Sequence, residues 1–192
     1  MTGSFKVQRT QVGSPFVIAA MESALSAGEV GVIGFEANGG FLTASPFLVN
    51  GQTLAALPTR DSFLPILALL DLASREKRPV SAISDAFGMP VALSGRLEEY
   101  PTEASNALMA RLRASPGNLS SFIAPFGDGA AVDETDGLRV HLTEGNTIHF
   151  RPSGNAPEMR CYVEAATEEG AACMLEMALE FLRNAAGRQR ED

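Results

Sequence analysis

The sequence lacks tryptophan and contains only two cysteines, two histidines and two tyrosines among its 192 residues. Cys161 and Cys173 show neither CxxC nor metal-ligand spacing, so two buried, reduced thiols are favoured over a disulfide. His141 and His149 have no third ligand within reach in the sequence, which argues against a zinc site. The sequence therefore predicts no metal ligands in this chain.

Long apolar runs and basic clusters are absent as well. No stretch of about 18 uninterrupted apolar residues is present and no signal-peptide pattern opens the sequence, so we expect a cytoplasmic protein without a membrane partner. The net charge of −8 and the isoelectric point near 4.8 would repel a nucleic-acid backbone. A small anionic ligand is still compatible with this charge, because it responds to a local focus of arginines and backbone dipoles.

The hydrophobic content of 45% is sufficient to bury a core, in one large domain or two small ones. The first half reads as α/β, with expected strands at 5–9, 30–35 and 41–44, and a helix at 14–27. A further helix at 61–77 is apolar nearly all round, so we expect it in the middle of a domain.

The pattern changes near residue 100, which predicts a first domain at 1–100 and a second at 101–192. The second half reads as α+β, with helices packed on one face of a small antiparallel sheet. Expected helices open near 102, 119 and 167, and expected strands cover 130–134, 137–142, 147–150 and 159–164.

The most informative stretch is RPSGNAPEMR at residues 151–160. Arg151 can direct two N–H donors onto phosphate oxygens, and Ser153 adds a hydroxyl. Gly154 and Asn155 tolerate positive φ, which would turn backbone N–H groups inward as an anion-binding nest. The residues alone support an ordinary turn between strands equally well.

The turn at 143–146 permits more than one register for the hairpin before this loop, and matching of hydrophobic residues favours one of them. The expected pairs are Val140 with Phe150, Leu142 with Ile148, His141 with His149 and Arg139 with Arg151. Two arginines and two histidines would then share one face, where an anion would relieve the crowding of like charges.

A second group of polar residues lies in the glycine-rich segment at 34–40. Glu36 and Asn38 are two residues apart, and a carboxylate beside an amide suits the vicinal hydroxyls of a sugar. The alternative for these residues is a glycine-rich turn with a solvent-facing glutamate.

The chain resembles the α-D-phosphohexomutase family, which includes phosphomannomutase and phosphoglucomutase. Residues 151–157 resemble the family's RPSGTEP phosphate loop, with Asn155 and Ala156 in place of Thr and Glu. Residues 34–40 resemble its GEXSGH sugar loop, with Asn38 in place of Ser and Gly40 in place of His. Residues 9–13 resemble its RTKVG loop, and the segments at 59–61 and 136–139 also fit the family in the expected order.

The resemblance covers part of the family's third domain and its complete fourth domain. It implies phosphate binding by Arg151, Ser153, Gly154 and Asn155, sugar binding by Glu36, Asn38 and Gly40, and sugar orientation by Gly13 and Ser14.

The resemblance also implies an isomerase that interconverts hexose 1-phosphate and hexose 6-phosphate through a phosphoserine and a hexose 1,6-bisphosphate. Neither a TASHN-like serine loop nor a DGDxDR magnesium loop occurs here, so we expect no catalytic residue in this chain, no activity of the chain alone, and magnesium ligands outside it. The alternatives are a free-standing sugar-phosphate-binding or regulatory module and a purely structural remnant. A homodimer through the open sheet edge of the incomplete third domain is a further expectation.

Overall fold

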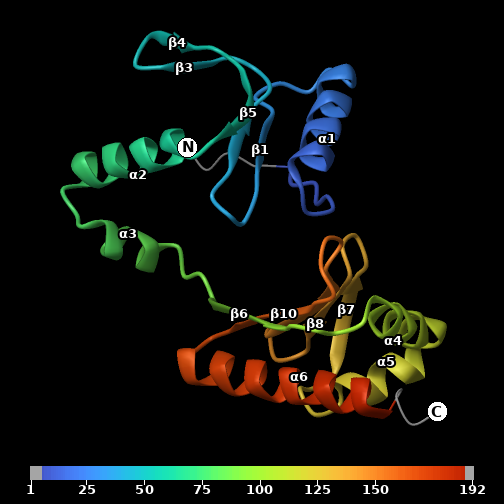
Figure 1. Cartoon of the computed structure of the whole chain (residues 1–192). Helices are drawn as coiled ribbons and strands as arrows, with labels where there is room; N and C mark the ends of the chain where they lie inside the picture. Colours follow the sequence, from blue (N-terminus) through green and yellow to red (C-terminus); the bar gives the residue numbers. More distant parts are fainter. Residues whose placement is uncertain (1–5, 189–192) are drawn as a thin grey trace. The chain divides into compact units, whose positions relative to one another are not determined.

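The structure is a computed structural model that describes residues 6–188, and it divides into two compact units between Met89 and Pro90 (Figure 1). The predicted boundary after residue 100 is therefore about eleven residues too late. The segment between the two positions contains strand β6 (Val91–Leu97), which pairs with a strand of the second unit. Each unit is described below by itself.

The first unit is built on a three-stranded antiparallel sheet of order β1-β2-β5, formed by β1 (Ile33–Phe35), β2 (Phe41–Thr43) and β5 (Leu57–Asp61). Helix α1 (Ser14–Ser26) packs against β1 and buries Val17 and Met21 beside Leu42. Gly34 makes this approach possible, because a Cβ there would lie 2.4 Å from Val17 Cγ1 and 2.5 Å from Met21 Sδ. Residues 6–9 form no strand, and Phe5 lies outside the described residues.

The remainder of the first unit consists of a hairpin and two helices. The hairpin pairs β3 (Phe47–Val49) with β4 (Gln52–Leu54), and helices α2 (Phe63–Glu76) and α3 (Val80–Ala86) follow β5. The prediction that the helix at 61–77 is central to a domain is wrong for this structure, since Phe63 is 75% exposed and Leu67 61% exposed. Within the described residues α2 packs against α3, and Ile33 and Phe35 of β1 stay exposed instead of being covered by it.

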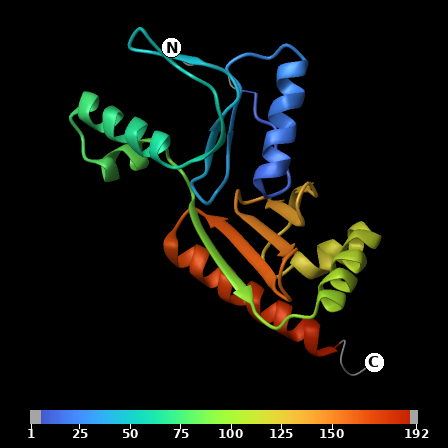
Figure 2. The same ribbon diagram turned by 45° about the horizontal axis from the view of Figure 1, so that its top comes forward.

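The second unit is a five-stranded antiparallel sheet with helices on one face (Figure 2). Its strand order is β6-β10-β9-β8-β7, with β7 (Gly129–Asp133), β8 (Leu138–Leu142), β9 (Thr147–Pro152) and β10 (Met159–Ala165). The helices are α4 (Thr102–Ala114), α5 (Pro116–Ile123) and α6 (Glu168–Arg188). The mixed fold class predicted from the sequence is confirmed.

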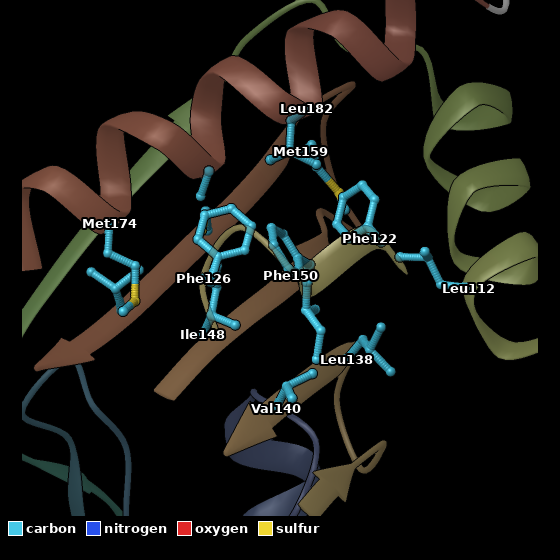
Figure 3. Packing of buried hydrophobic residues seen from close by; sticks show 14 of the residues in the cluster. Leu112, Phe122, Phe126, Leu138, Val140, Ile148, Phe150, Met159, Met174 and Leu182 are labelled. Atoms are coloured by element: carbon cyan, nitrogen blue, oxygen red, sulfur yellow. The ribbon is translucent and has the colours of Figure 1, made fainter. Parts of the chain in front are cut away.

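Strict alternation of buried and half-buried residues divides this sheet into an apolar face and a polar face. On the apolar face, Ile148 and Phe150 of β9 are fully buried, and Phe122 of α5 meets Phe150 edge-to-face at 5.2 Å (Figure 3). Cys161 belongs to this core, and burial raises the pKa of its thiol to about 12. Cys173 on α6 is exposed, so the prediction of two buried thiols holds for Cys161 alone.

The register of the β8–β9 hairpin differs by two residues from the prediction. Val140 pairs with Ile148, Arg139 with His149, and His141 with Thr147. A shift of two keeps every side chain on its face, so hydrophobic matching cannot distinguish the two registers. The turn decides instead: Gly145, at φ 87°, donates its N–H to the Leu142 carbonyl and permits a shorter connection.

Candidate functional site

Arg151 lies at the end of β9 on the polar face of the sheet, where its guanidinium is largely buried. Its Nε lies 2.6 Å from Oδ2 of Asp136, without the alignment of a hydrogen bond, and the two side chains are 13% and 20% exposed. Its Nη1 is buried and has no hydrogen-bond partner. A buried donor without an acceptor costs free energy, so an anion oxygen placed at Nη1 would stabilise this arrangement.

Ion pairs on this face correct the expected crowding of arginines. Asp136 neutralises Arg151 directly. The predicted crowding of Arg139 against Arg151 does not occur, because Arg139 donates from Nη2 to both carboxylate oxygens of Glu164 at 2.9 and 3.0 Å. An anion is therefore not needed to separate these two arginines.

The loop after Arg151 is closed by its own backbone. Ser153 donates its N–H to the Glu158 carbonyl at 2.9 Å, and Glu158 donates to the Ala156 carbonyl at 2.7 Å. Neither Gly154 nor Asn155 adopts positive φ, so the predicted nest is wrong. The loop instead exposes the peptide of Gly154 and the side chain of Asn155 to solvent, with the Ser153 hydroxyl beside them.

Three arginines lie in register across the polar face next to this loop. Arg160 of β10 pairs with Arg151 on one side and with Arg96 of β6 on the other. Glu158 compensates part of this charge, with Oε2 3.2 Å from Arg160 Nη2 and Oε1 3.7 Å from Arg96 Nη1. An open depression of about 410 Å³ lies on this row, lined by Ser94, Gly95, Arg96, Arg160 and Tyr162. Glu98 Oε1 also lies 2.7 Å from Arg96 Nη2, so each of the three arginines, Arg151 included, has a carboxylate beside it. The row therefore offers an anion N–H donors rather than an excess of positive charge.

His149 of β9 lies beside this row, paired with Tyr162 of β10 on one side and Arg139 of β8 on the other. Its ring stacks on Tyr162 at 5.4 Å, and its Nε2–H donates to the Asp136 carbonyl at 2.5 Å. Burial lowers the pKa of His149, and the positive charges of Arg139 and Arg151 lower it further, while the bond to the Asp136 carbonyl and the Asp136 carboxylate oppose the shift. The neutral imidazole is therefore favoured in the folded protein.

We expect this shift to make the protein less stable in mild acid. The unfolded chain binds the proton at the ordinary pKa of 6.5, above the folded-state pKa, so the stabilisation is complete above pH 6.5 and is lost as pH falls through the folded-state value. The melting temperature of the wild type should fall more between pH 7.5 and pH 5 than that of His149→Gln, which does not titrate. Parallel curves for the two proteins would contradict the assignment.

In the first unit, Glu36 follows β1 and its side chain is only 7% exposed. The hydroxyl of Ser14, at the start of α1 after Gly13, donates to Glu36 Oε1 at 2.7 Å. Arg60 Nη1 lies 3.9 Å from the same oxygen. The structure thus brings the segments at 13–14 and 36 together, and the alternative of a solvent-facing glutamate does not describe it.

Asn38 and Gly40 shape the turn that carries Glu36. Asn38 Oδ1 accepts the N–H of Gly40 at 3.0 Å, and Glu36 donates its N–H to the Gly40 carbonyl at 2.8 Å. Gly39 adopts φ 86°, which favours glycine. The amide nitrogen of Asn38 keeps two donors for a ligand, because its oxygen is the atom used in the turn.

Two residues that contact the predicted site residues were not themselves predicted: Arg60, beside Glu36, and Asp136, beside Arg151. Arg60 belongs to the segment at 59–61 that fitted the family resemblance, so its place beside Glu36 had a signal in the sequence. Asp136 likewise belongs to the segment at 136–139 that fitted the resemblance, but its pairing with Arg151 depends on how the chain turns before β8.

Other kinds of site find little support in the described part of the chain. Across residues 6–188, no three His, Cys, Asp or Glu side chains gather closely enough to hold a metal ion, so these residues do not fit a magnesium centre. No helix in the same range is long and apolar enough to cross a membrane.

Two family models match this chain. The model described as the phosphoglucomutase/phosphomannomutase C-terminal domain matches residues 75–180, and that described as alpha/beta/alpha domain III of the same proteins matches residues 3–88. Together they account for nearly the whole sequence.

Similar proteins agree with these matches. A phosphomannomutase of Sinorhizobium fredii is 49% identical over 179 residues, and one of Salmonella muenchen is 39% identical over 184 residues. These alignments cover 93% and 95% of this chain, but the chain spans only 38% of each relative. The crystal structure of a phosphoglucomutase/phosphomannomutase family protein from Burkholderia thailandensis has the same fold, with a TM-score of 0.58 and 20% identity over 93% of this chain and 32% of that one.

Proposed function

Because the chain belongs to the phosphoglucomutase/phosphomannomutase family, we propose that it is the C-terminal, substrate-binding portion of a phosphohexomutase. Such an enzyme interconverts hexose 1-phosphate and hexose 6-phosphate through a phosphoserine and a bisphosphorylated sugar. The observation that carries the proposal is the buried Arg151 guanidinium, whose Nη1 has no acceptor and which precedes an exposed loop of small polar residues. A phosphate oxygen is the partner that this donor lacks.

Each group has a separate role in this proposal. Arg151, Ser153, Gly154 and Asn155 bind the phosphate that does not react, through the guanidinium, the hydroxyl, the exposed peptide and the amide. In the first unit, Glu36 accepts hydrogen bonds from sugar hydroxyls and the Asn38 amide donates to them. Gly40 contributes through its backbone, whose N–H and carbonyl hold the turn that carries Glu36. Gly13 and Ser14 orient the sugar by fixing Glu36.

The phosphoryl transfer itself is assigned to residues outside this chain. Transfer requires a nucleophile and a cation that offsets the charge of the transition state. Magnesium would supply that charge, but the described residues do not form a site for it. We therefore expect this chain to bind hexose phosphates without mutase activity of its own.

Calorimetric titration of the 192-residue chain with mannose 1-phosphate and with glucose 1,6-bisphosphate tests the proposal. We expect both to bind, and inorganic phosphate to bind more weakly because it makes only the phosphate contacts. The absence of heat with all three ligands would contradict a binding role and would favour a structural remnant. Comparison of mannose, glucose and glucosamine phosphates then identifies the preferred sugar.

A further inference from the structure

Arg60 of β5 occupies the space beside Gly40, and this is why residue 40 is a glycine. A Cβ on residue 40 would lie 2.3 Å from Arg60 Cδ and 2.7 Å from Arg60 Cγ. The backbone does not demand glycine there, since Gly40 has no positive φ, whereas the neighbouring Gly39 has φ 86° and open space around it. The Arg60 stem can therefore lie in this position only because residue 40 has no side chain.

The guanidinium at the end of this stem is available to a ligand. The side chain of Arg60 is 53% exposed, and the one contact of its guanidinium within the described residues is the 3.9 Å approach of Nη1 to Glu36 Oε1. That distance is too long for a hydrogen bond, so all five N–H donors remain unused by the described protein groups. The stem is fixed against the turn while the donors face solvent.

Glu36 supplies the complementary acceptors. Its carboxylate is nearly buried, and the Ser14 hydroxyl occupies only Oε1. Acceptors on a carboxylate beside donors on a guanidinium match a pair of neighbouring hydroxyls, in which each oxygen accepts one hydrogen bond and each hydrogen donates one. A phosphate dianion fits less well at this place, because the Glu36 charge repels it.

We propose that Arg60 is a sugar-binding residue of this chain, which donates hydrogen bonds to the ring hydroxyl oxygens whose protons Glu36 accepts. This inference rests on the proposed function, because it assumes that the ligand is a hexose phosphate. The Arg60 side chain lies where the side chain of a larger residue at position 40 would lie.

The first test replaces Arg60 with Met, which keeps the stem and removes the donors. We expect Arg60→Met to weaken the binding of mannose 1-phosphate by about 10- to 100-fold and to leave inorganic phosphate unchanged. Arg75→Met is the matched control, because it removes an exposed arginine of α2 that pairs with Asp71, and we expect no change in either affinity.

The second test uses the overlap with Gly40. In Gly40→Ala the new methyl group displaces the Arg60 stem, so we expect the same loss of affinity with a melting temperature near that of the wild type. The double variant Gly40→Ala/Arg60→Met should bind no more weakly than either single variant, because both remove the same donor.

The outcomes separate this inference from the proposed function. Unchanged affinity of Arg60→Met for mannose 1-phosphate, in a chain whose wild type binds it, would overturn the role of Arg60 alone. Additive losses in the double variant would overturn the link between Gly40 and Arg60. A wild type that binds no hexose phosphate would overturn the proposed function, and the role of Arg60 with it.

Discussion

Arg151→Met should lower the affinity for both mannose 1-phosphate and inorganic phosphate by about 10- to 100-fold, the effect of losing a charged hydrogen bond of about 1.5–3 kcal/mol. Arg151→Lys should have an intermediate affinity, because it keeps the charge but loses the planar fork. Calorimetric titration of each variant with both ligands measures the effect. Unchanged affinity for inorganic phosphate in Arg151→Met would contradict the assignment.

The stability of the Arg151→Met variant must be measured separately, because Asp136 loses its partner. A largely buried carboxylate left unpaired destabilises the fold, so we expect a lower melting temperature in the single variant. In Arg151→Met/Asp136→Asn the unpaired charge is gone, and we expect stability to recover while phosphate binding does not. Arg139→Met, which breaks the neighbouring pair with Glu164, is the control that should keep its phosphate affinity.

Gly137→Ala should destabilise the second unit by about 3 kcal/mol or more. Gly137 has φ 84°, which is strained for any side chain, and its Cβ would lie 2.4 Å from the Phe150 carbonyl oxygen. That oxygen belongs to the backbone of β9, so the overlap can be relieved only by moving the strand that carries Arg151. Phosphate affinity should therefore fall together with stability.

Gly145→Ala provides the matched control for this substitution. Gly145 has a similar φ of 87°, but a Cβ on residue 145 would meet no atom within 4 Å. Its replacement should cost only the backbone strain, about 1–2 kcal/mol, and leave phosphate affinity unchanged. Chemical denaturation of the two variants compares their free energies of unfolding, and equal losses would contradict the role assigned to the Phe150 overlap.

The sequence was most informative where chemistry is carried by neighbouring residues. The position of the loop after Arg151 as a connection between two strands followed from its composition and from the alternating segments around it. The resemblance also placed Ser14 and Glu36 in one site, and the structure joins them by a hydrogen bond of 2.7 Å. These relations depend on short segments whose local pattern is unambiguous.

Prediction from the sequence failed where the structure depends on long-range contacts, or where two arrangements satisfy the hydrophobic pattern equally well. A two-residue shift of the β8–β9 hairpin preserves its faces, so only the turn geometry at Gly145 could select the register. The predicted boundary at residue 100 put residues 91–97 in the first domain, whereas their pairing with β10 puts them in the second unit. The apolar composition of α2 predicted burial, but burial requires a partner surface that composition does not reveal.

The central proposal is that the loop after Arg151 in the second unit binds the phosphate of a hexose phosphate, and that the turn carrying Glu36 in the first unit binds sugar hydroxyls. Titration of the ¹⁵N-labelled chain with mannose 1-phosphate, followed by amide chemical shifts, tests it most directly. We expect the largest shifts at Ser153, Gly154 and Asn155 in the second unit and at Gly39 and Gly40 in the first. Saturable shifts confined to other residues, or no shifts at millimolar ligand, would contradict the claim.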